Sequence, residues 1–501
     1  MQHTFDLEKP LFKLSANGNS MPFSIRDSFA GVAIFGASGS GKTTGPGAYL
    51  AKNYLSAGYG GCVLTSNQDE KDLWIKYCRD TNRLDDLVIV EPGGHTFNFL
   101  NYLTSHNKQA TYIQNIASTL KVVIQSAEEK NGGKSDDPFW ENSLSQLVFF
   151  TIDLCLLGFN KLSVQEIYEV ALSAPQKDRK EEAGGNKSYF RLAYEAAQKK
   201  VNALVSQFKE GLNEEDRKKF ERPENFESMI LNGVPDARRM KAIDQFFAET
   251  FRDLSDKTRS IVLFSFTGYL FNLLQEPIYS MFCHSQNAST FMPEDSRQGK
   301  IILLNLPIDL YEKAGRDVQI LFKYLWQKAM QRTKILPDTC PVFLFIDESQ
   351  LFLMENDSVY LTTARKSLIA NVLMSQNLPN YYAFMGGGDS RKSEYKVKSL
   401  IGNLATKIFA CNTCVETNNW ASQLIGSGYT KKDSHSLTVS GNFSSSHSTQ
   451  YELEPMVRPE LFGHLLQGGP ENGFIVETYV HRQGKLFDNG HNFKKVIFKQ
   501  K

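Results

Sequence analysis

The sequence predicts an α/β protein with a mostly parallel central sheet flanked by helices and one inserted all-helical domain. Apolar runs and helical segments alternate through the first hundred residues and again from about residue 300, which is the rhythm of a parallel sheet. Between about Asn107 and Cys283 the pattern is almost wholly helical. The expected domains are therefore 1–105, a helical insertion 106–290, and 291–501.

The predicted strands are short apolar runs bounded by polar or glycine-rich turns. In chain order they are Ala30–Phe35, Gly61–Thr65, Leu87–Glu91, Lys300–Asn305, Pro341–Ile346, Leu368–Met374 and Leu404–Ala410, with a closing pair near Gly473–Tyr479 and Leu486–Asp488. An insertion does not disturb the order of such strands, because the entropy of closing a loop rises only slowly with its length.

A glycine-rich turn directly follows the first predicted strand. Residues 36 to 43 read Gly-Ala-Ser-Gly-Ser-Gly-Lys-Thr, the pattern of a phosphate-binding loop between a strand and a helix. Backbone N–H groups of this turn can surround the β- and γ-phosphates of a nucleotide, and the positive end of the helix adds to the attraction. We expect Lys42 to reach the terminal phosphate and Thr43 to ligate Mg²⁺. The alternative is a glycine-rich turn that binds nothing. The residues expected to hold the nucleotide are Gly36, Ala37, Ser38, Gly39, Ser40, Gly41, Lys42, Thr43 and Thr44.

An acidic pair follows another apolar run far downstream. Val342–Ile346 suits a strand that is buried on both faces, and Asp347 and Glu348 come directly after it. Carboxylates that follow such strands emerge at the edge of the sheet where ligands sit. Asp347 is expected to hold Mg²⁺ and Glu348 to polarise the attacking water. The alternative is an acidic strand end that caps the next turn. Both segments together predict a P-loop NTPase that hydrolyses ATP with Mg²⁺.

Composition limits the kinds of partner. The 501 residues include 56 basic and 55 acidic ones, for a net charge of +1, so contact with nucleic acid requires a local basic patch or a pore lined by several subunits. Seven scattered cysteines predict no disulfide framework and indicate a reducing cytosol.

No apolar run approaches the ~20 residues of a membrane span. The strongest candidate, Leu147–Leu157, carries Asp153 in its middle and is interpreted as a buried helix. The N-terminus also lacks signal-peptide features.

Two polar segments are candidates for contact with partners. Gly386–Lys392, with Lys396 and Lys398 close behind, predicts a flexible basic loop that either grips phosphates in the channel of a ring or is a solvated surface loop. Tyr429–Thr449 is rich in Ser, Thr, His and Gly. Its low hydrophobicity predicts a mobile loop that a partner orders.

Three further residues belong to types that bind metal ions or anchor hydrophobic cores in other proteins. Cys411 and Cys414 have the spacing of half a zinc site, but no second pair or nearby histidine completes four ligands. Small residues at the end of a strand explain this pair better. Trp140 is expected to anchor the core of the helical domain.

The phosphate-binding loop, Ile346–Glu348 and the block Ala364–Gln376 together resemble the TraG/TraD-like type IV coupling proteins, which belong to the FtsK/HerA group of hexameric DNA-translocating ATPases. Further similar stretches are Asp256–Ser260, Lys300–Pro307 and Asn403–Lys407. The likeness spans residues 30 to 490, and the inserted all-helical domain is a trait of that family. The resemblance implies a RecA-like P-loop fold, ATP and Mg²⁺ as cofactors, and a homo-hexamer.

The resemblance also implies roles for two residues. Arg365 occupies the place of an arginine that reaches a neighbouring subunit's nucleotide and stabilises charge on the transferred phosphoryl group. Its alternative is a surface arginine that pairs with Glu355 or Asp357. Gln376 occupies the place of a glutamine that senses the γ-phosphate. Its alternative is a polar residue that caps the strand end.

The leading hypothesis is an ATP-driven ring motor that moves DNA, in particular single-stranded DNA, or a relaxase–DNA complex, as in conjugative transfer. Membrane-bound members of the family begin with transmembrane helices, and this sequence shows none. A cytoplasmic protein is therefore expected, without direct membrane insertion and peripheral to the inner membrane through a type IV secretion or other membrane-anchoring subunit. Three alternatives stay open. They are an ATPase receptor or unfoldase that delivers protein substrates to a secretion channel, a HerA-like ATPase of an anti-phage system, and a protein in which nucleotide is only a structural switch.

Overall fold

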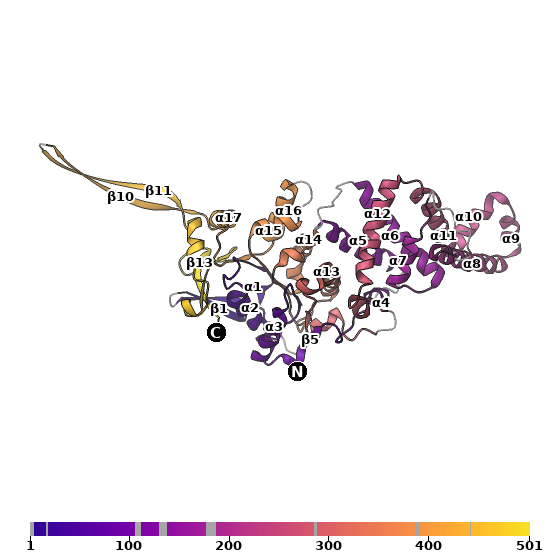
Figure 1. Ribbon diagram of the computed structural model, residues 1–501, viewed down its shortest axis with the longest axis horizontal. Coiled ribbons are helices and arrows are strands. Elements are labelled where there is room, and N and C mark those ends of the chain that lie inside the picture. Colours follow the sequence, from indigo (N-terminus) through magenta and orange to yellow (C-terminus); the bar gives the residue numbers. More distant parts are fainter. Residues whose placement is uncertain are drawn as a thin grey trace. The chain divides into compact units, whose positions relative to one another are not determined.

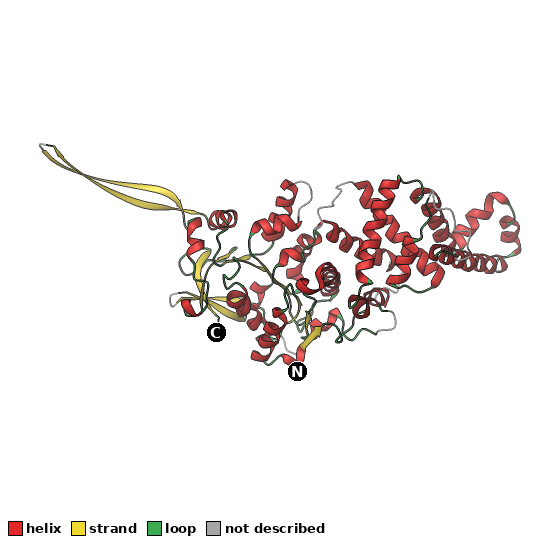
Figure 2. Ribbon diagram, viewed as in Figure 1, coloured by secondary structure: helices red, strands yellow, loops and turns green. Residues whose placement is uncertain are grey.

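The computed structural model describes residues 5–16, 19–105, 112–129, 138–176, 187–284, 288–385, 390–440 and 442–500. The chain forms two compact units. Unit 1 comprises Met1–Val88, Pro293–Asn305 and Gln327–Lys501, and unit 2 comprises Ile89–Met292 and Leu306–Trp326. Figure 2 shows strands gathered in unit 1, whereas unit 2 is almost entirely helical. The domain boundaries expected from the sequence stay a prediction.

A nine-stranded sheet forms the centre of unit 1, in the order β13-β12-β9-β3-β8-β7-β4-β6-β5. Neighbouring strands from β9 to β6 are parallel, and β12 is antiparallel to both β9 and β13. This mostly parallel sheet with flanking helices confirms the predicted fold class. The strands are β3 (Val32–Phe35), β4 (Gly60–Leu64), β5 (Leu87–Val90), β6 (Ile301–Leu304), β7 (Val342–Ile346), β8 (Ile369–Ser375), β9 (Thr406–Phe409), β12 (Ile475–Arg482) and β13 (Phe493–Lys499).

One predicted strand is wrong. The last strand is Phe493–Lys499 rather than Leu486–Asp488, because the connection after β12 is longer than its first glycine suggests. Gly484 and Gly490 both adopt positive φ, and the Phe487 N–H donates to the His491 carbonyl. The residues predicted as a strand thus lie in a turn.

Helices and two small sheets complete unit 1 (Figure 1). Aromatic packing joins the first helices to the sheet: Trp74 of α3 stacks on Phe343 of β7, with ring centroids 5.7 Å apart, and Tyr54 of α2 lies 6.0 Å from the same ring. The helices are α1 (Ile25–Ser28), α2 (Ala48–Ser56), α3 (Asp69–Asp80), α14 (Asn356–Ala364), α15 (Leu378–Met385), α16 (Ser390–Gly402) and α17 (Val415–Ile425); β1 (Pro10–Ala16) pairs with β2 (Asn19–Ser24), and β10 (Ser427–Ser440) pairs with β11 (Asn442–Pro455).

The pairing of β10 with β11 contradicts the prediction of a mobile loop at Tyr429–Thr449. The two strands pair residue by residue over their whole length. The low hydrophobicity of this segment suggested mobility, but polar residues also stabilise paired strands through cross-strand contacts. Thr449, for example, donates a hydrogen bond of 2.7 Å to Asp433 on the opposite strand.

A helix also replaces part of the predicted basic loop. Gly386 to Asp389 lie outside the described residues, and the chain from Ser390 onward is α16. This helix buries Val397, Leu400 and Ile401 at helical spacing. Two lysines of this helix are paired, Lys396 with Glu355 at 3.2 Å and Lys398 with Glu394 at 2.5 Å.

Unit 2 is a bundle centred on α6. Side-chain caps begin several of its helices, with Ser163, Ser188, Asn213 and Ser255 accepting backbone N–H groups. The helices are α4 (Phe99–Ser105), α5 (Tyr112–Glu129), α6 (Pro138–Phe159), α7 (Val164–Leu172), α8 (Tyr189–Glu210), α9 (Glu214–Phe220), α10 (Pro223–Gly233), α11 (Pro235–Gln245) and α12 (Asp256–Leu273), and α13 (Ile308–Arg332) contributes its residues up to Trp326.

Helix α6 carries both predicted core features of the helical insertion. Trp140 is buried, as expected. Asp153, in the middle of the apolar run, pairs with Arg239 of α11 at 2.5 Å. Burial raises the pKa of Asp153, and the arginine lowers it. Among the described residues, the stretch Phe139–Phe159 is long and apolar enough to cross a membrane by length and composition, and about half of it, 56%, is buried within the protein.

Candidate functional site

The predicted phosphate-binding loop connects β3 to a helix whose first turn is unusually wide. Thr43–Gly47 forms a π-helical turn, and α2 continues from Ala48. Pro46 lies inside this turn and has no N–H to donate. The Gly47 N–H instead donates to the Lys42 carbonyl at 2.9 Å. The helix expected to begin near Lys42 therefore starts with a π turn that follows directly from the sequence Thr-Thr-Gly-Pro-Gly.

The loop has the free space and polar atoms that a phosphate requires. Gly39 and Gly41 have φ of 76° and 78°, a region that favours glycine. A Cβ at Gly39 would meet no atom within 4 Å. The Ser40 hydroxyl is buried and has no hydrogen-bond partner within the part of the chain that the structure describes. An open cradle beside an unsatisfied buried donor fits a bound triphosphate.

The chain far downstream supports this loop from outside. A Cβ at Gly41 would lie 2.6 Å from Val476 of β12 and 2.7 Å from the Gln467 carbonyl, so only glycine fits there. The Gln500 side chain donates to the Thr44 hydroxyl at 2.7 Å and accepts the Gly469 N–H at 2.7 Å. No pattern in the sequence predicts this support, because it joins residues more than 400 positions apart.

The acidic pair lies beside the loop at the carboxyl edge of the sheet. The Thr43 hydroxyl donates to Asp347 Oδ2 at 2.5 Å, and Lys42 Nζ pairs with Glu348 Oε1 at 3.1 Å. The side chains of Lys42 and Glu348 are only 9% and 16% exposed. The structure therefore brings four predicted residues together, although the chain separates the two pairs by about 300 positions.

Glu348 is held in an unusual backbone conformation by several side chains. Its φ of 45° is left-handed, which is uncommon outside glycine. Gln350 donates to its carboxylate at 2.8 Å, and Gln376, the first residue after β8, donates at 3.3 Å. A strained residue that three polar side chains orient is typical of an active site. Gln376 thus lies within hydrogen-bond reach of the predicted catalytic carboxylate.

The sequence interpretation missed a further buried carboxylate at this edge, Glu70. Its Oε1 accepts the Ser66 N–H, the Ser66 hydroxyl and the Asn67 N–H, at 2.9, 2.7 and 3.0 Å. Burial and the neighbouring Asp347 together raise the pKa of Glu70 to about 8. Burial also raises the pKa of Asp347, whereas the positive charge of Lys42 lowers it by a smaller amount. Two crowded carboxyl groups indicate a site that favours a cation. The order β7-β4 would have revealed Glu70, since it places the end of β4 next to Asp347.

Arg365 lies at the opposite edge of the sheet. It follows α14 and precedes β8, whose far end leads to Gln376. The seven residues of β8 separate these ends by roughly 20 Å, which exceeds the reach of one arginine side chain. Arg365 is exposed. The structure therefore does not bring Arg365 to the phosphate-binding loop of the same chain.

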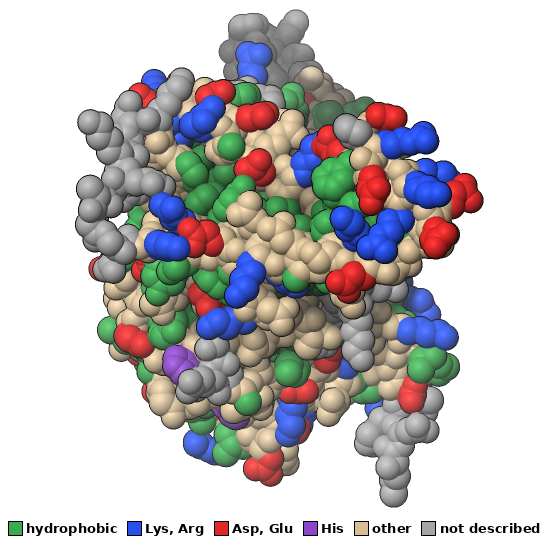
Figure 3. Space-filling view, turned by 90° about the vertical axis from the view of Figure 1, so that its right-hand side faces the viewer, with side chains coloured by type: hydrophobic (Ala, Val, Ile, Leu, Met, Phe, Trp, Pro, Cys, Tyr) green, Lys and Arg blue, Asp and Glu red, His purple; other side chains and the backbone are tan. Residues whose placement is uncertain are grey.

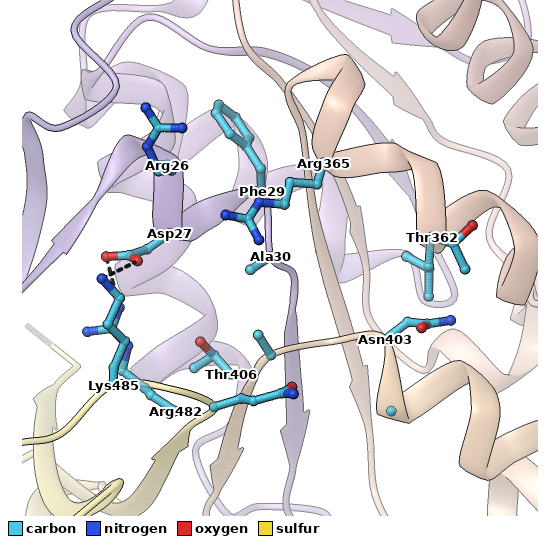
Figure 4. A pocket seen from close by; sticks show the side chains of 14 residues that line it. Arg26, Asp27, Phe29, Ala30, Thr362, Arg365, Asn403, Thr406, Arg482 and Lys485 are labelled. Atoms are coloured by element: carbon cyan, nitrogen blue, oxygen red, sulfur yellow. Dashed lines mark ion pairs between the residues drawn. The ribbon is translucent and has the colours of Figure 1, made fainter.

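Arg365 lines a pocket of about 560 Å³ at the amino ends of β3, β8 and β9. Figure 4 shows its guanidinium group directed toward Phe29 and Ala30. The lining contains four basic side chains and one acidic side chain. Arg482 pairs with that acid, Asp27, at 2.8 Å, and Lys485 lies 3.8 Å from it. The remaining lining residues with a positive charge are Arg26 and Arg365. The pocket thus has a surplus of positive charge.

Solved structures that share this architecture include several of the bacterial conjugative coupling protein TrwB. Its unbound form with 70 N-terminal residues deleted has a TM-score of 0.60 at 15% identity and covers 98% of this chain and 88% of its own. A TrwB complex with ADP and Mg²⁺ has a TM-score of 0.56 at 14% identity, with 98% and 89% covered. A complex with a nonhydrolysable GTP analogue has a TM-score of 0.54 at 13% identity, with 98% and 96% covered. At these identities the likeness shows the fold.

Among curated proteins, no sequence matches this chain significantly. The family model described as "Type IV secretory system Conjugative DNA transfer" matches residues 11–468, which is most of the chain. The expected resemblance to type IV coupling proteins is confirmed by this match. The chain belongs to the type IV secretory system conjugative DNA transfer family.

Proposed function

We propose that this protein hydrolyses ATP with Mg²⁺ as a hexameric ring and uses the energy to move single-stranded DNA or a relaxase–DNA complex during conjugative transfer. One observation carries the proposal: Lys42, Thr43, Asp347, Glu348 and Gln376 converge at the carboxyl edge of the sheet, beside an open glycine-rich loop. The family gives the DNA and the type IV secretion partner. The TrwB complexes with ADP and Mg²⁺ and with an ATP analogue support the choice of cofactors.

The contacts of the site suggest how each residue acts. Lys42 pairs with Glu348 and would exchange this carboxylate for the terminal phosphate, which frees Glu348 to accept a proton from water. Thr43 and Asp347, already joined by a hydrogen bond, would share Mg²⁺. Bound Mg²⁺ supplies positive charge to the β- and γ-phosphate oxygens. Gln376 stays within reach of Glu348 and would report whether the γ-phosphate is present.

Arg365 would act on the nucleotide of a neighbouring copy. It lies too far from Lys42 to act within its own chain, and its pocket has surplus positive charge. An arginine supplied in trans contributes a large factor to phosphoryl transfer, about 10³–10⁵ in turnover. Hydrolysis would therefore depend on assembly. We also propose that the ring is cytoplasmic and reaches the inner membrane through a membrane-anchoring subunit.

A Glu348→Gln variant tests the enzyme. It should bind ATP with Mg²⁺ within about threefold of the wild-type affinity and lose hydrolysis by at least ~100-fold, because the amide cannot accept the proton from water. Glu355→Gln is the matched control, since Glu355 is 57% exposed and pairs with Lys396. Hydrolysis in the wild type should rise with DNA and with protein concentration. A wild type that binds no ATP, or whose specific activity ignores both variables, would contradict the motor.

A second candidate is an ATPase receptor that delivers protein substrates. The net charge of +1 favours it, and Figure 3 shows basic and acidic side chains interspersed on the drawn face rather than gathered by sign. Nuclease-treated pull-down of protein substrates, compared with DNA stimulation of hydrolysis, separates the two functions.

A further inference from the structure

Lys407 is a buried cation that the proposed mechanism does not use. This second residue of β9 is 4% exposed, and its Nζ donates to the Leu404 carbonyl at 2.5 Å. An ammonium group has three donors, and within the described residues the other two have no acceptor. Burial lowers the pKa of Lys407 to about 8, and no neighbouring carboxylate opposes this shift in the described part of the chain. A buried charge without a partner is costly.

A second donor without an acceptor lies on the neighbouring strand, at His481 of β12. His481 and Lys407 are cross-strand partners, so their side chains share one face of the sheet. The amide nitrogen of Asn492 lies 3.0 Å from His481 Nε2. Because an amide nitrogen only donates, Nε2 accepts and the proton of the neutral ring is on Nδ1. This Nδ1 is buried and has no hydrogen-bond partner among the described residues.

Lys407 also lines a cavity of about 180 Å³ in unit 1. Helix α15 packs against both α16 and α17, and these three helices supply the apolar part of the lining. Lys398 of α16 lines the cavity as well, but its side chain is 54% exposed and pairs with Glu394 at 2.5 Å. Lys398 therefore lies at the mouth of the cavity. The apolar and aromatic lining residues are Leu378, Tyr382, Val397, Ile401, Trp420 and Leu424.

The cavity is distinct from the two sites already described. Adjacent residues of a strand point to opposite faces of a sheet. Thr406 lines the basic pocket around Arg365, whereas Lys407 lines the cavity, so the two hollows lie on opposite faces. The phosphate-binding loop follows the carboxyl end of β3, and β9 is parallel to β3. Lys407 lies in the amino-terminal half of β9, away from that loop.

The chemistry of this cavity selects a small aromatic monocarboxylate. Each of the two oxygens of a carboxylate accepts hydrogen bonds, so it suits the Lys407 ammonium and the His481 N–H beside it. An aromatic ring suits the apolar walls, which include Tyr382 and Trp420. An engineered cavity of about 150 Å³ holds one benzene ring, so about 180 Å³ has room for a ring with one carboxylate. A phosphate group would leave the apolar walls uncovered.

We propose that this cavity binds a small aromatic carboxylic acid, whose carboxylate pairs with Lys407 and whose ring contacts Tyr382 and Trp420. Binding would turn a costly unpaired charge into an ion pair shielded from water. The proposal goes beyond the proposed function, because it depends neither on nucleotide nor on a ring of subunits. If the cavity binds no acid, the motor stands, and if the motor fails, the cavity keeps its own test.

Titration calorimetry of the full chain with sodium benzoate tests the site. Benzoate should bind with a Kd of about 1 mM or below. Benzamide has nearly the same shape without the charge and should bind at least ~10-fold more weakly. Acetate has the charge without the ring and should also bind at least ~10-fold more weakly. Benzoate that does not bind, or that binds no better than benzamide or acetate, would overturn the site.

The two lysines of the lining provide a matched pair of variants. Lys407→Met should weaken benzoate binding by at least ~10-fold and reduce its preference over benzamide to less than about twofold. Its urea midpoint at pH 7 should be no lower than that of the wild type, which checks its folding. Lys398→Met should bind benzoate within about twofold of the wild type, because Lys398 lies at the mouth. A loss in Lys398→Met without a loss in Lys407→Met would contradict the proposal.

Two further variants distinguish the cavity from the basic pocket around Arg365. Leu424→Trp should fill the cavity from α17 while Lys407 stays in place, and it should weaken benzoate binding by at least ~10-fold. Arg365→Ala should bind benzoate within about twofold of the wild type. The urea midpoint again checks folding. Benzoate binding that survives Leu424→Trp and is lost in Arg365→Ala would assign the carboxylate to the basic pocket and overturn the proposal.

Discussion

The two edges of the central sheet carry charge in opposite ways. At the carboxyl edge, Lys42 and Thr43 meet Glu348 and Asp347 in buried contacts of one chain. At the amino edge, the pocket around Arg365 holds four basic side chains against one acidic side chain. The opposite charges of the first edge balance each other, whereas the basic side chains that line the pocket at the second edge outnumber its one acidic side chain, even though Arg26 also pairs with Glu8 outside the lining. This difference suggests that one edge binds a ligand and the other acts on a ligand bound elsewhere.

Loss of Lys42 is the most severe test of the carboxyl edge. Lys42→Ala should weaken binding of ATP with Mg²⁺ by at least ~100-fold, because the loop loses its lysine cation and the negative charge of Glu348 is then no longer balanced by it. Titration calorimetry measures this affinity. The control is Lys52→Ala, since Lys52 is 39% exposed and pairs with Asp80. Undiminished affinity in Lys42→Ala would remove the basis for the site.

Loss of Arg365 should separate the two edges. Arg365→Ala is expected to keep ATP affinity within about twofold and to lower turnover by at least ~10³-fold, because in the proposed ring the arginine would act only on a transition state in another copy. Lys366→Ala, its exposed neighbour, is the control. Mixing Arg365→Ala with Lys42→Ala copies should restore part of the turnover, since each supplies what the other lacks. No recovery in mixed assemblies would argue against action in trans.

Loss of the Gln376 side chain, at the carboxyl edge, should lower turnover less than loss of Arg365. Its amide donates to Glu348 at 3.3 Å, and Gln350 also holds this carboxylate. Gln376→Ala should therefore lower turnover by about 10-fold and leave ATP affinity unchanged. Steady-state kinetics measures both quantities. An equal loss of affinity and turnover would assign Gln376 to nucleotide binding instead.

The strand that borders the basic pocket gives a test of stability against pH. Lys407 of β9 is buried, and burial lowers its pKa to about 8 from 10.5. Lys407 therefore binds more protons in the unfolded chain between about pH 8 and 10.5, so its own contribution to the free energy of unfolding should rise with pH across this window by up to about 3 kcal/mol. Buried cysteines with raised pKa values, Cys78 and Cys340 among them, act in the opposite direction, so the contribution of Lys407 is measured as the difference between the wild type and Lys407→Met. The urea midpoint of Lys407→Met should exceed that of the wild type at pH 7, and this excess should shrink as the pH rises to 10. An excess that stays constant from pH 8 to 10 would contradict the shifted pKa.

The smallest effect is expected for Arg26 at the basic pocket. Its pair with Glu8 at 2.5 Å is 49% and 70% exposed, so Arg26→Ala should change the free energy of unfolding by less than about 0.5 kcal/mol. Turnover should fall by only about two- to threefold if Arg365 carries the action in trans. If Arg26→Ala lost more turnover than Arg365→Ala, Arg26 rather than Arg365 would be the residue that acts in trans.

Local patterns predicted the parts of the molecule that depend on neighbouring residues. A buried strand before a glycine-rich turn identified the phosphate-binding loop, and the run before Asp347 identified its partner strand. Contacts between distant segments left no such pattern. Glu70 required the order of strands, and the support of Thr44 by Gln500 joins residues 456 positions apart. Tyr429–Thr449 was misjudged because hydrophobicity does not report polar cross-strand pairing, which depends on register.

The support of the phosphate-binding loop by Gln500 has a consequence for how the protein is made. A ribosome completes residues 36 to 44 long before it adds Val476 and Gln500, which hold this loop from outside. Until then, the growing chain contains the phosphate-binding loop without the two residues that support it. Under the proposed function, firm binding of nucleotide would therefore have to wait until Val476 and Gln500 have been added.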